Sequence, residues 1–142
     1  MDTILLIDNN AAILENFKEY FEIEGFTILV ANKGSTGIEM ASECMPNLII
    51  SEIIMHEMDG YEILRLLSGK DNTSGIPFIF STTKSEKMDK IKALELGADD
   101  YIVKPFCMEI LGEMAKKWIR SGSKRLFSLL VACPATFLSI YC

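Results

Sequence analysis

The sequence predicts a doubly wound α/β domain, in which a parallel sheet of five strands lies between two layers formed by five helices. Five short apolar runs alternate along the chain with stretches whose apolar residues recur every three or four positions, as on one face of a helix. The runs are continuous rather than alternating in polarity, which is typical of strands covered on both faces. Short loops join the elements, which favours right-handed crossovers within a parallel sheet.

The predicted strands are the apolar runs themselves, at residues 4–7, 27–31, 48–50, 78–80 and 101–103. The first predicted helix has the clearest signals, because Asn9 or Asn10 precedes it as an N-cap and Gly25 follows it as a terminator. Its apolar stripe consists of Ile13, Leu14, Phe17, Tyr20 and Phe21.

The four later helices have weaker signals. They are predicted near residues 35–45, 60–69, 85–96 and 106–120. The starts of the last three are marked by Asp59-Gly60, by Ser85 and by Pro105-Phe106.

Composition limits the functions that this chain can have. With 142 residues, 49% of them hydrophobic and 24% charged, it fits one ordinary globular domain. A formal net charge of −6 argues against direct nucleic-acid binding, which needs clustered Lys and Arg. The four cysteines form no C-x-x-C pair, and the run from Ile4 to Ile7 has no basic flank typical of a secretion signal. We therefore expect a cytoplasmic protein without a zinc site or a disulfide framework.

Polar side chains follow four of the predicted strands. Asp8 comes after the first strand, Glu52 after the third, Thr82 after the fourth and Lys104 after the fifth. Ligand sites of doubly wound sheets lie at the carboxyl ends of the strands. If the first strand lies beside the third, two carboxylates, a hydroxyl and an ammonium group should converge there.

These residues, with the motifs around them, resemble the receiver domain of response regulators. The motifs occur in the family's order as Asp8, Pro46 to Glu52 with Met58-Asp59-Gly60, Thr82, and Gly97 to Phe106. The resemblance covers roughly residues 3–119. It implies a flavodoxin-like fold with strand order 2-1-3-4-5. It also implies magnesium-dependent transfer of a phosphoryl group from a histidine kinase to an aspartate that follows the third strand.

The resemblance assigns a role to each matching position. The phosphoacceptor position holds Glu52 instead of aspartate. The hydroxyl that contacts the phosphoryl group falls on Thr82, the ammonium group on Lys104 and the aromatic switch residue on Tyr101. The family also implies a cis peptide bond between Lys104 and Pro105.

The metal ligands implied by the resemblance are Asp8, Asn9, Glu52 and the backbone carbonyl of Ile54. Asn9 stands where a second acidic residue is expected, and Mg²⁺ prefers anionic oxygens. Glutamate is one methylene longer than aspartate, which places its carboxylate roughly 1.5 Å further along, and an offset of that size costs about 100-fold in rate. We therefore expect weakened Mg²⁺ binding and impaired phosphoryl acceptance.

The preferred functional hypothesis is a non-enzymatic signalling module in which Glu52 is a fixed negative charge paired with Lys104. It would bind a histidine kinase or a downstream effector protein through residues 85–120, with a homodimer as a further option. The alternative is a working magnesium-dependent phosphoryl acceptor. A weaker alternative is a flavodoxin-like cofactor binder, which is disfavoured because no glycine-rich loop follows the first strand.

Each candidate residue also has a purely structural interpretation. Asp8 and Asn9 could serve only as helix caps, and the expected ion pair could persist in an inactive relic. Thr82 could bond only to backbone, and Tyr101 could be only a core aromatic. His56 is interpreted as an exposed loop residue.

The C-terminal segment departs from the receiver pattern. We assign residues 1–120 to the receiver domain and residues 121–142 to an apolar tail of uncertain role. Residues 126–142 carry no charge and follow a basic flank, as in a membrane anchor. However, a helix of that length reaches only about 25 Å and Pro134 interrupts it. Membrane contact, docking on this domain or on a second copy, and an altered chain end all stay open.

Overall fold

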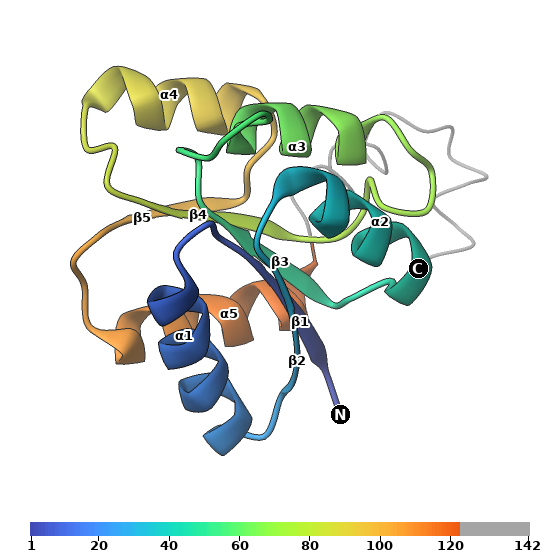
Figure 1. The fold of residues 1–142 in the computed structure, drawn as a ribbon, viewed down its shortest axis with the longest axis vertical. Coiled ribbons are helices and arrows are strands. Elements are labelled where there is room, and N and C mark those ends of the chain that lie inside the picture. Colours follow the sequence, from blue (N-terminus) through green and yellow to red (C-terminus); the bar gives the residue numbers. More distant parts are fainter. Residues whose placement is uncertain (123–142) are drawn as a thin grey trace.

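Strands and helices alternate throughout residues 1–122, the part of the chain that the computed structural model describes (Figure 1). The strands are β1 (Thr3–Ile7), β2 (Thr27–Ala31), β3 (Leu48–Ser51), β4 (Phe78–Thr82) and β5 (Asp100–Val103). The helices are α1 (Ala11–Ile23), α2 (Gly34–Cys44), α3 (Gly60–Ser68), α4 (Lys87–Glu95) and α5 (Met108–Ser121). All ten predicted elements are confirmed.

The five strands form one parallel sheet in the order β2-β1-β3-β4-β5, which confirms the expected topology. In the register between β1 and β3, Ile7 lies opposite Ser51. The N–H of Glu52 donates to the carbonyl of Ile7 (2.9 Å), which extends this ladder by one residue. The residues that follow β1 and β3, Asp8 and Glu52, are therefore neighbours at the carboxyl edge of the sheet.

Helices cover both faces of the sheet (Figure 1), with α1 and α5 on one side and α2, α3 and α4 on the other. Successive residues of β1 enter opposite cores, because strand side chains alternate between faces. Ile4 and Leu6 pack in the core with α1 and α5, whereas Leu5 and Ile7 pack in the core with α2 and α3.

The prediction of strands covered on both faces holds for β3 and β4, whose residues are all buried, and needs correction for β2. Val30 of β2 is exposed. The reason is that β2 is an edge strand, where the covering helices reach only part of its surface.

Helix starts also refine the predictions. The cap of α1 is Asn10 rather than Asn9, since its Oδ1 accepts hydrogen bonds from the N–H groups of Ala12 (3.0 Å) and Ile13 (3.2 Å). Two helices begin later than predicted, α4 at residue 87 instead of 85 and α5 at residue 108 instead of 106. The residues before them, Glu86 and Cys107, have extended backbone conformations, and their side chains accept no capping hydrogen bond.

The loop between β3 and α3 contains a strained turn. Glu57 has φ 66°, and the N–H of Met58 donates to the carbonyl of His56 (2.7 Å), two residues earlier. This is a γ-turn with positive φ at its centre, a rare conformation that an L side chain with a Cβ atom disfavours.

Exchange of Glu57 for glycine should therefore raise the free energy of unfolding by about 1 kcal/mol, since the strain that it relieves exceeds the added freedom of the unfolded chain. Urea denaturation followed by circular dichroism measures the change. Glu57→Ala is the control, because it removes the same carboxylate and keeps the Cβ atom. An equal gain in the alanine variant would assign the effect to the charge and contradict the backbone explanation.

Within residues 1–122, no helix is both long enough and apolar enough to cross a membrane. The expectations for the tail, including membrane contact through residues 126–142, fall on residues 123–142, outside the described part of the chain.

Candidate functional site

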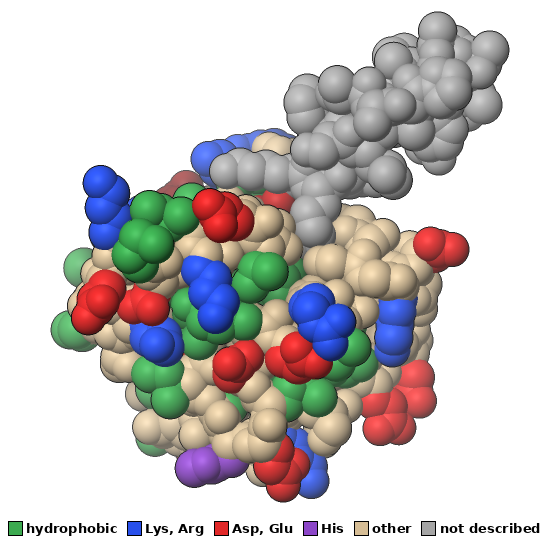
Figure 2. All heavy atoms as spheres, turned by 90° about the horizontal axis from the view of Figure 1, so that it is seen from above, with side chains coloured by type: hydrophobic (Ala, Val, Ile, Leu, Met, Phe, Trp, Pro, Cys, Tyr) green, Lys and Arg blue, Asp and Glu red, His purple; other side chains and the backbone are tan. Residues whose placement is uncertain are grey.

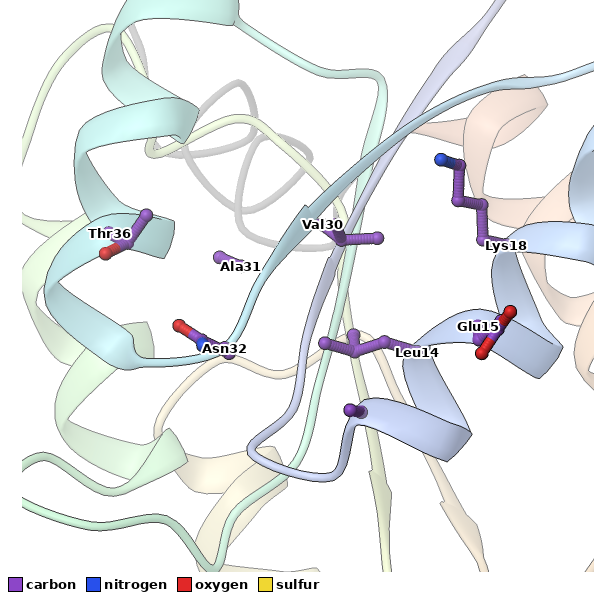
Figure 3. Close-up of a pocket in the computed structure, with 8 residues that line it drawn as sticks. Leu14, Glu15, Lys18, Val30, Ala31, Asn32 and Thr36 are labelled. Carbon is purple, nitrogen blue, oxygen red and sulfur yellow. The ribbon is translucent and has the colours of Figure 1, made fainter.

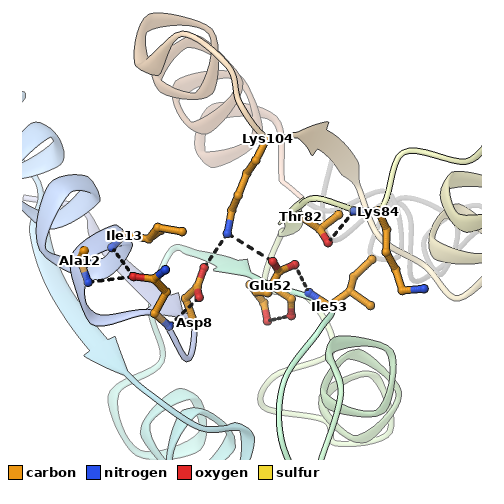
Figure 4. A network of polar contacts seen from close by, with 10 residues as sticks. Asp8, Ala12, Ile13, Glu52, Ile53, Thr82, Lys84 and Lys104 are labelled. Atoms are coloured by element: carbon orange, nitrogen blue, oxygen red, sulfur yellow. Dashed lines mark hydrogen bonds and ion pairs between the residues drawn. The ribbon is translucent and has the colours of Figure 1, made fainter.

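The carboxyl edge of the sheet holds a buried ion cluster of Asp8, Glu52 and Lys104 (Figure 4). The Lys104 Nζ donates to Asp8 Oδ2 at 2.8 Å and to Glu52 Oε1 at 3.3 Å. The predicted ion pair between Glu52 and Lys104 is confirmed, and the pair with Asp8 is the shorter of the two. The ion cluster joins the ends of β1, β3 and β5. Its three residues are far apart in the sequence.

The remaining carboxylate oxygens are bound by the backbone. Asp8 Oδ1 accepts from the N–H of Asn10 (2.9 Å), and Glu52 Oε2 accepts from the N–H of Ile53 (2.7 Å). The side chains of Asp8 and Glu52 are each 7% exposed and that of Lys104 is 12% exposed. The ion cluster therefore places two acidic side chains and one lysine in a site that is almost closed to solvent.

The peptide bond between Lys104 and Pro105 is cis, as the resemblance implied.

Thr82 and Tyr101 meet at one loop residue that the sequence did not single out. The Thr82 hydroxyl accepts from the N–H of Lys84 (3.2 Å), and the Tyr101 hydroxyl donates to the carbonyl of Lys84 (2.8 Å). Thr82 is fully buried beside Glu52 in the view of Figure 4, with this bond directed toward the loop. Lys84 takes part through its backbone N–H and carbonyl groups, which every non-proline residue has, so the residue type could not reveal this role.

Burial raises the pKa of the Tyr101 hydroxyl above its ordinary value, and the nearby Tyr61 hydroxyl and the Asp89 and Glu52 carboxylates raise it further. The hydroxyl therefore keeps its proton and stays a hydrogen-bond donor at physiological pH. The hydrogen bond from this hydroxyl to the Lys84 carbonyl holds the buried Tyr101 side chain beneath the loop that follows β4.

Asn9 does not join the ion cluster. It is exposed and lines a hollow of about 240 Å³ with Asn32, Lys33, His56 and Glu57. The interpretation of His56 as an exposed loop residue is confirmed.

The donor set does not fit the Mg²⁺ ion that the resemblance implies. Among residues 1–122, the carboxylates that the structure places at Lys104 are Asp8 and Glu52, and both bind its ammonium. Asn9 offers at most a neutral oxygen, which is a weaker ligand for a hard cation than a carboxylate. Among residues 1–122, no group of three or more His, Cys, Asp and Glu side chains is arranged to hold a metal ion. The arrangement suits an ammonium counter-ion rather than a divalent metal.

A larger hollow of about 580 Å³ lies away from the ion cluster, between α1 and β2 (Figure 3). Its lining includes Leu14, Glu15, Lys18 and Val30 and contains none of the three clustered ions. The chemistry of this domain is therefore better judged from the ion cluster than from this hollow.

Comparison with known proteins agrees with this architecture. The family model described as the response regulator receiver domain matches residues 4–116. The chain is 38% identical to Response regulator SaeR of Staphylococcus epidermidis over 106 residues, which cover 75% of this chain and 45% of that protein. It is 35% identical to the probable transcriptional regulator ycf29 of Porphyra purpurea over 120 residues, which cover 84% of this chain and 57% of that one.

A solved structure gives the same result. The signal receiver domain of a signal transduction histidine kinase from Syntrophus aciditrophicus superimposes with a TM-score of 0.79 and 32% sequence identity, covering 85% of this chain and 92% of that one. The chain spans about half the length of the curated relatives above. From the match over residues 4–116 and the five-stranded parallel fold, we conclude that the chain belongs to the response-regulator receiver domain family.

Proposed function

We propose that this receiver domain signals through protein contacts, without enzymatic activity, and that Glu52 serves as a fixed negative charge in place of a transferred phosphoryl group. The observation that carries the proposal is the contact between Glu52 Oε1 and the Lys104 ammonium at 3.3 Å. The carboxylate reaches the same lysine that the resemblance assigns to the phosphoryl group. The ammonium is thereby neutralised without a kinase.

The imitation is partial. A carboxylate carries one charge and two acceptor oxygens, whereas a phosphoryl group carries about −1.5 to −2 and three. In this chain Glu52 bonds to Lys104 and to the N–H of Ile53, while the Thr82 hydroxyl bonds to the Lys84 backbone. The proposal therefore depends on the contact of Glu52 with Lys104 and on the buried Tyr101. Thr82 contributes only a hydrogen bond to the backbone, as in its structural interpretation.

Impaired phosphoryl acceptance is the second part of the proposal. Receiver domains use Mg²⁺ for phosphorylation. Support for the impairment comes from the two available carboxylates being bound to Lys104, from Asn9 lying in the exposed hollow, and from the longer side chain of Glu52. We propose that the site works without the metal.

The proposed contact surface is formed by residues 85–120, which include α4, β5 and α5. Four large apolar side chains are exposed there, namely Met88, Leu94, Val103 and Ile110. Response regulators interact with histidine kinases and effector proteins. We propose a protein of one of these two classes, or a second copy of the chain, as the partner, acting in the cytoplasm.

Intact-mass spectrometry after exposure to a small phosphodonor with Mg²⁺ tests the proposal. We expect no phosphoryl adduct on the wild type and no saturable, Mg²⁺-dependent binding of beryllofluoride. The double variant Asn9→Asp, Glu52→Asp is the matched control, because it restores the acidic residues of the family pattern and should form the adduct. An adduct on Glu52 of the wild type would instead support the working phosphoryl acceptor.

A further inference from the structure

Helix α4 is only weakly held by apolar packing. Among its residues only Ala93 is fully buried, and Met88 and Leu94 are exposed. Figure 2 looks onto the side of the molecule that carries α3 and α4, where acidic and basic side chains are interspersed. A helix with few buried apolar contacts opens easily, so specific polar contacts decide where it rests.

Two tyrosines supply such contacts at different points. The Tyr101 hydroxyl binds the carbonyl of Lys84, in the loop before α4. The Tyr61 hydroxyl, from α3, donates to the carbonyl of Asp89 in the first turn of α4 (3.3 Å). The ammonium of Lys92, one turn further along α4, lies 4.3 Å from the centroid of the Tyr61 ring. This distance is in the range of a cation–π contact, so α4 meets the Tyr61 side chain in two ways.

Both tyrosine rings pack on the same side chain of the sheet. Phe80 of β4 lies 5.6 Å from Tyr61 and 6.2 Å from Tyr101 between ring centroids, with edge-to-face geometry in both cases. The Phe80 ring therefore supports both tyrosine rings, whose hydroxyls reach α4 and the loop before it.

A backbone hydrogen bond connects the start of α3, where Tyr61 lies, to the residue that follows Glu52. Tyr61 follows Gly60, whose N–H donates to the carbonyl of Ile53 (2.8 Å), directly after Glu52. Burial, reinforced by the Asp89 and Asp59 carboxylates, raises the pKa of the Tyr61 hydroxyl, so it remains a donor at physiological pH.

We infer that Tyr61 is a second positioning residue of the contact surface, which fixes the first turn of α4 against α3 through Asp89, in addition to the loop contact of Tyr101. The inference rests on the proposed function only in treating residues 85–120 as the contact surface. Its test measures α4 directly and needs neither a partner nor a phosphodonor. Failure of the inference is therefore distinguishable from failure of the proposed function.

Amide hydrogen exchange of the Tyr61→Phe variant tests the inference. This change keeps the ring on Phe80 and the contact with Lys92 and removes only the hydroxyl. We expect exchange of the amides in residues 87–95 to accelerate about five-fold, as for the loss of one hydrogen bond in a local opening. Exchange in β1, β3 and β4 should not change.

Tyr20→Phe is the matched control, since it removes a tyrosine hydroxyl from α1, on the other face of the sheet. It should leave α4 exchange at the wild-type rate. The Tyr101→Phe variant should accelerate exchange mainly at residues 83–86, and the double variant with Tyr61→Phe should show both effects.

Two outcomes would overturn the inference. One is wild-type exchange of residues 87–95 in Tyr61→Phe. The other is an acceleration shared equally by α4 and the central strands, which would show that the hydroxyl stabilises the whole fold rather than the position of α4.

Discussion

Replacement of Lys104 by methionine should lower the free energy of unfolding at neutral pH by about 3 kcal/mol, because it leaves buried charges without their counter-ion. Lys104 is the cation bound to both Asp8 and Glu52, whose side chains are nearly inaccessible to water. Methionine fills a similar volume and removes the charge. The two carboxylates would then repel each other across a site of low polarity.

A second substitution identifies the electrostatic origin of the loss. Exchange of Glu52 for glutamine removes one of the two carboxylates, so Lys104→Met should cost less stability in the Glu52→Gln background than in the wild type. Urea denaturation of the four proteins measures this difference. An equal loss in both backgrounds would point to packing instead.

Lys116→Met is the matched control. Lys116 pairs with Glu24 at 3.6 Å, and both side chains are substantially exposed, so its loss should change stability by less than about 1 kcal/mol.

The Lys104→Met variant also tests the function. If Glu52 signals through Lys104, partner binding or the environment of Tyr101 should change. No change in either would contradict the fixed-charge proposal even if the stability loss is observed.

Replacement of Gly60 by alanine should lower the free energy of unfolding by about 2 to 3 kcal/mol, because the added methyl group has no space. A Cβ atom on Gly60 would collide with the carbonyl oxygen of Glu52 and lie 2.8 Å from both the Ile53 Cα and a ring carbon of Phe80. Two of these three neighbours are backbone and cannot rotate away. Relief would require movement of the chain that carries Glu52.

Thermal and urea denaturation measure the effect, with Gly69→Ala as the control at the other end of α3. A Cβ atom on Gly69 would meet its nearest neighbours at 3.7 Å, an ordinary contact, so this variant should be neutral or slightly stabilised. Equal losses in both variants would show that backbone flexibility, not the close approach at Glu52, sets the cost. The Gly60→Ala variant should in addition disturb the contact between Glu52 and Lys104.

The alternation of strands and helices could be predicted from the sequence because apolar periodicity reports burial directly. Element starts were less accurate. Ser85 and Pro105-Phe106 suggested early starts for α4 and α5. The helices start later because Glu86 and Cys107 are extended, and neither side chain makes a capping hydrogen bond that the sequence could signal. Both asparagines before α1 have capping chemistry, and only the backbone path selected Asn10.

The site was predicted in part. The type and position of Asp8, Glu52 and Lys104, each at a strand end, were sufficient to predict that they converge. The backbone partners were missed, above all Lys84 and the Asp89 carbonyl that Tyr61 binds. Every residue has a backbone N–H or C=O group, so such partners leave no mark in a sequence.

The sequence by itself determined the family, the order of the elements and the charges at the sheet edge, because these follow from residue types and their spacing along the chain. Only the tertiary structure decided that Lys104 binds Asp8 more closely than Glu52, that Asn9 lies outside the ion cluster and that the Tyr61 hydroxyl bonds to α4. These outcomes depend on the register of β1 against β3 and on the reach of individual side chains. Distances of a few ångströms between groups far apart in the chain are set by packing, which no local pattern encodes.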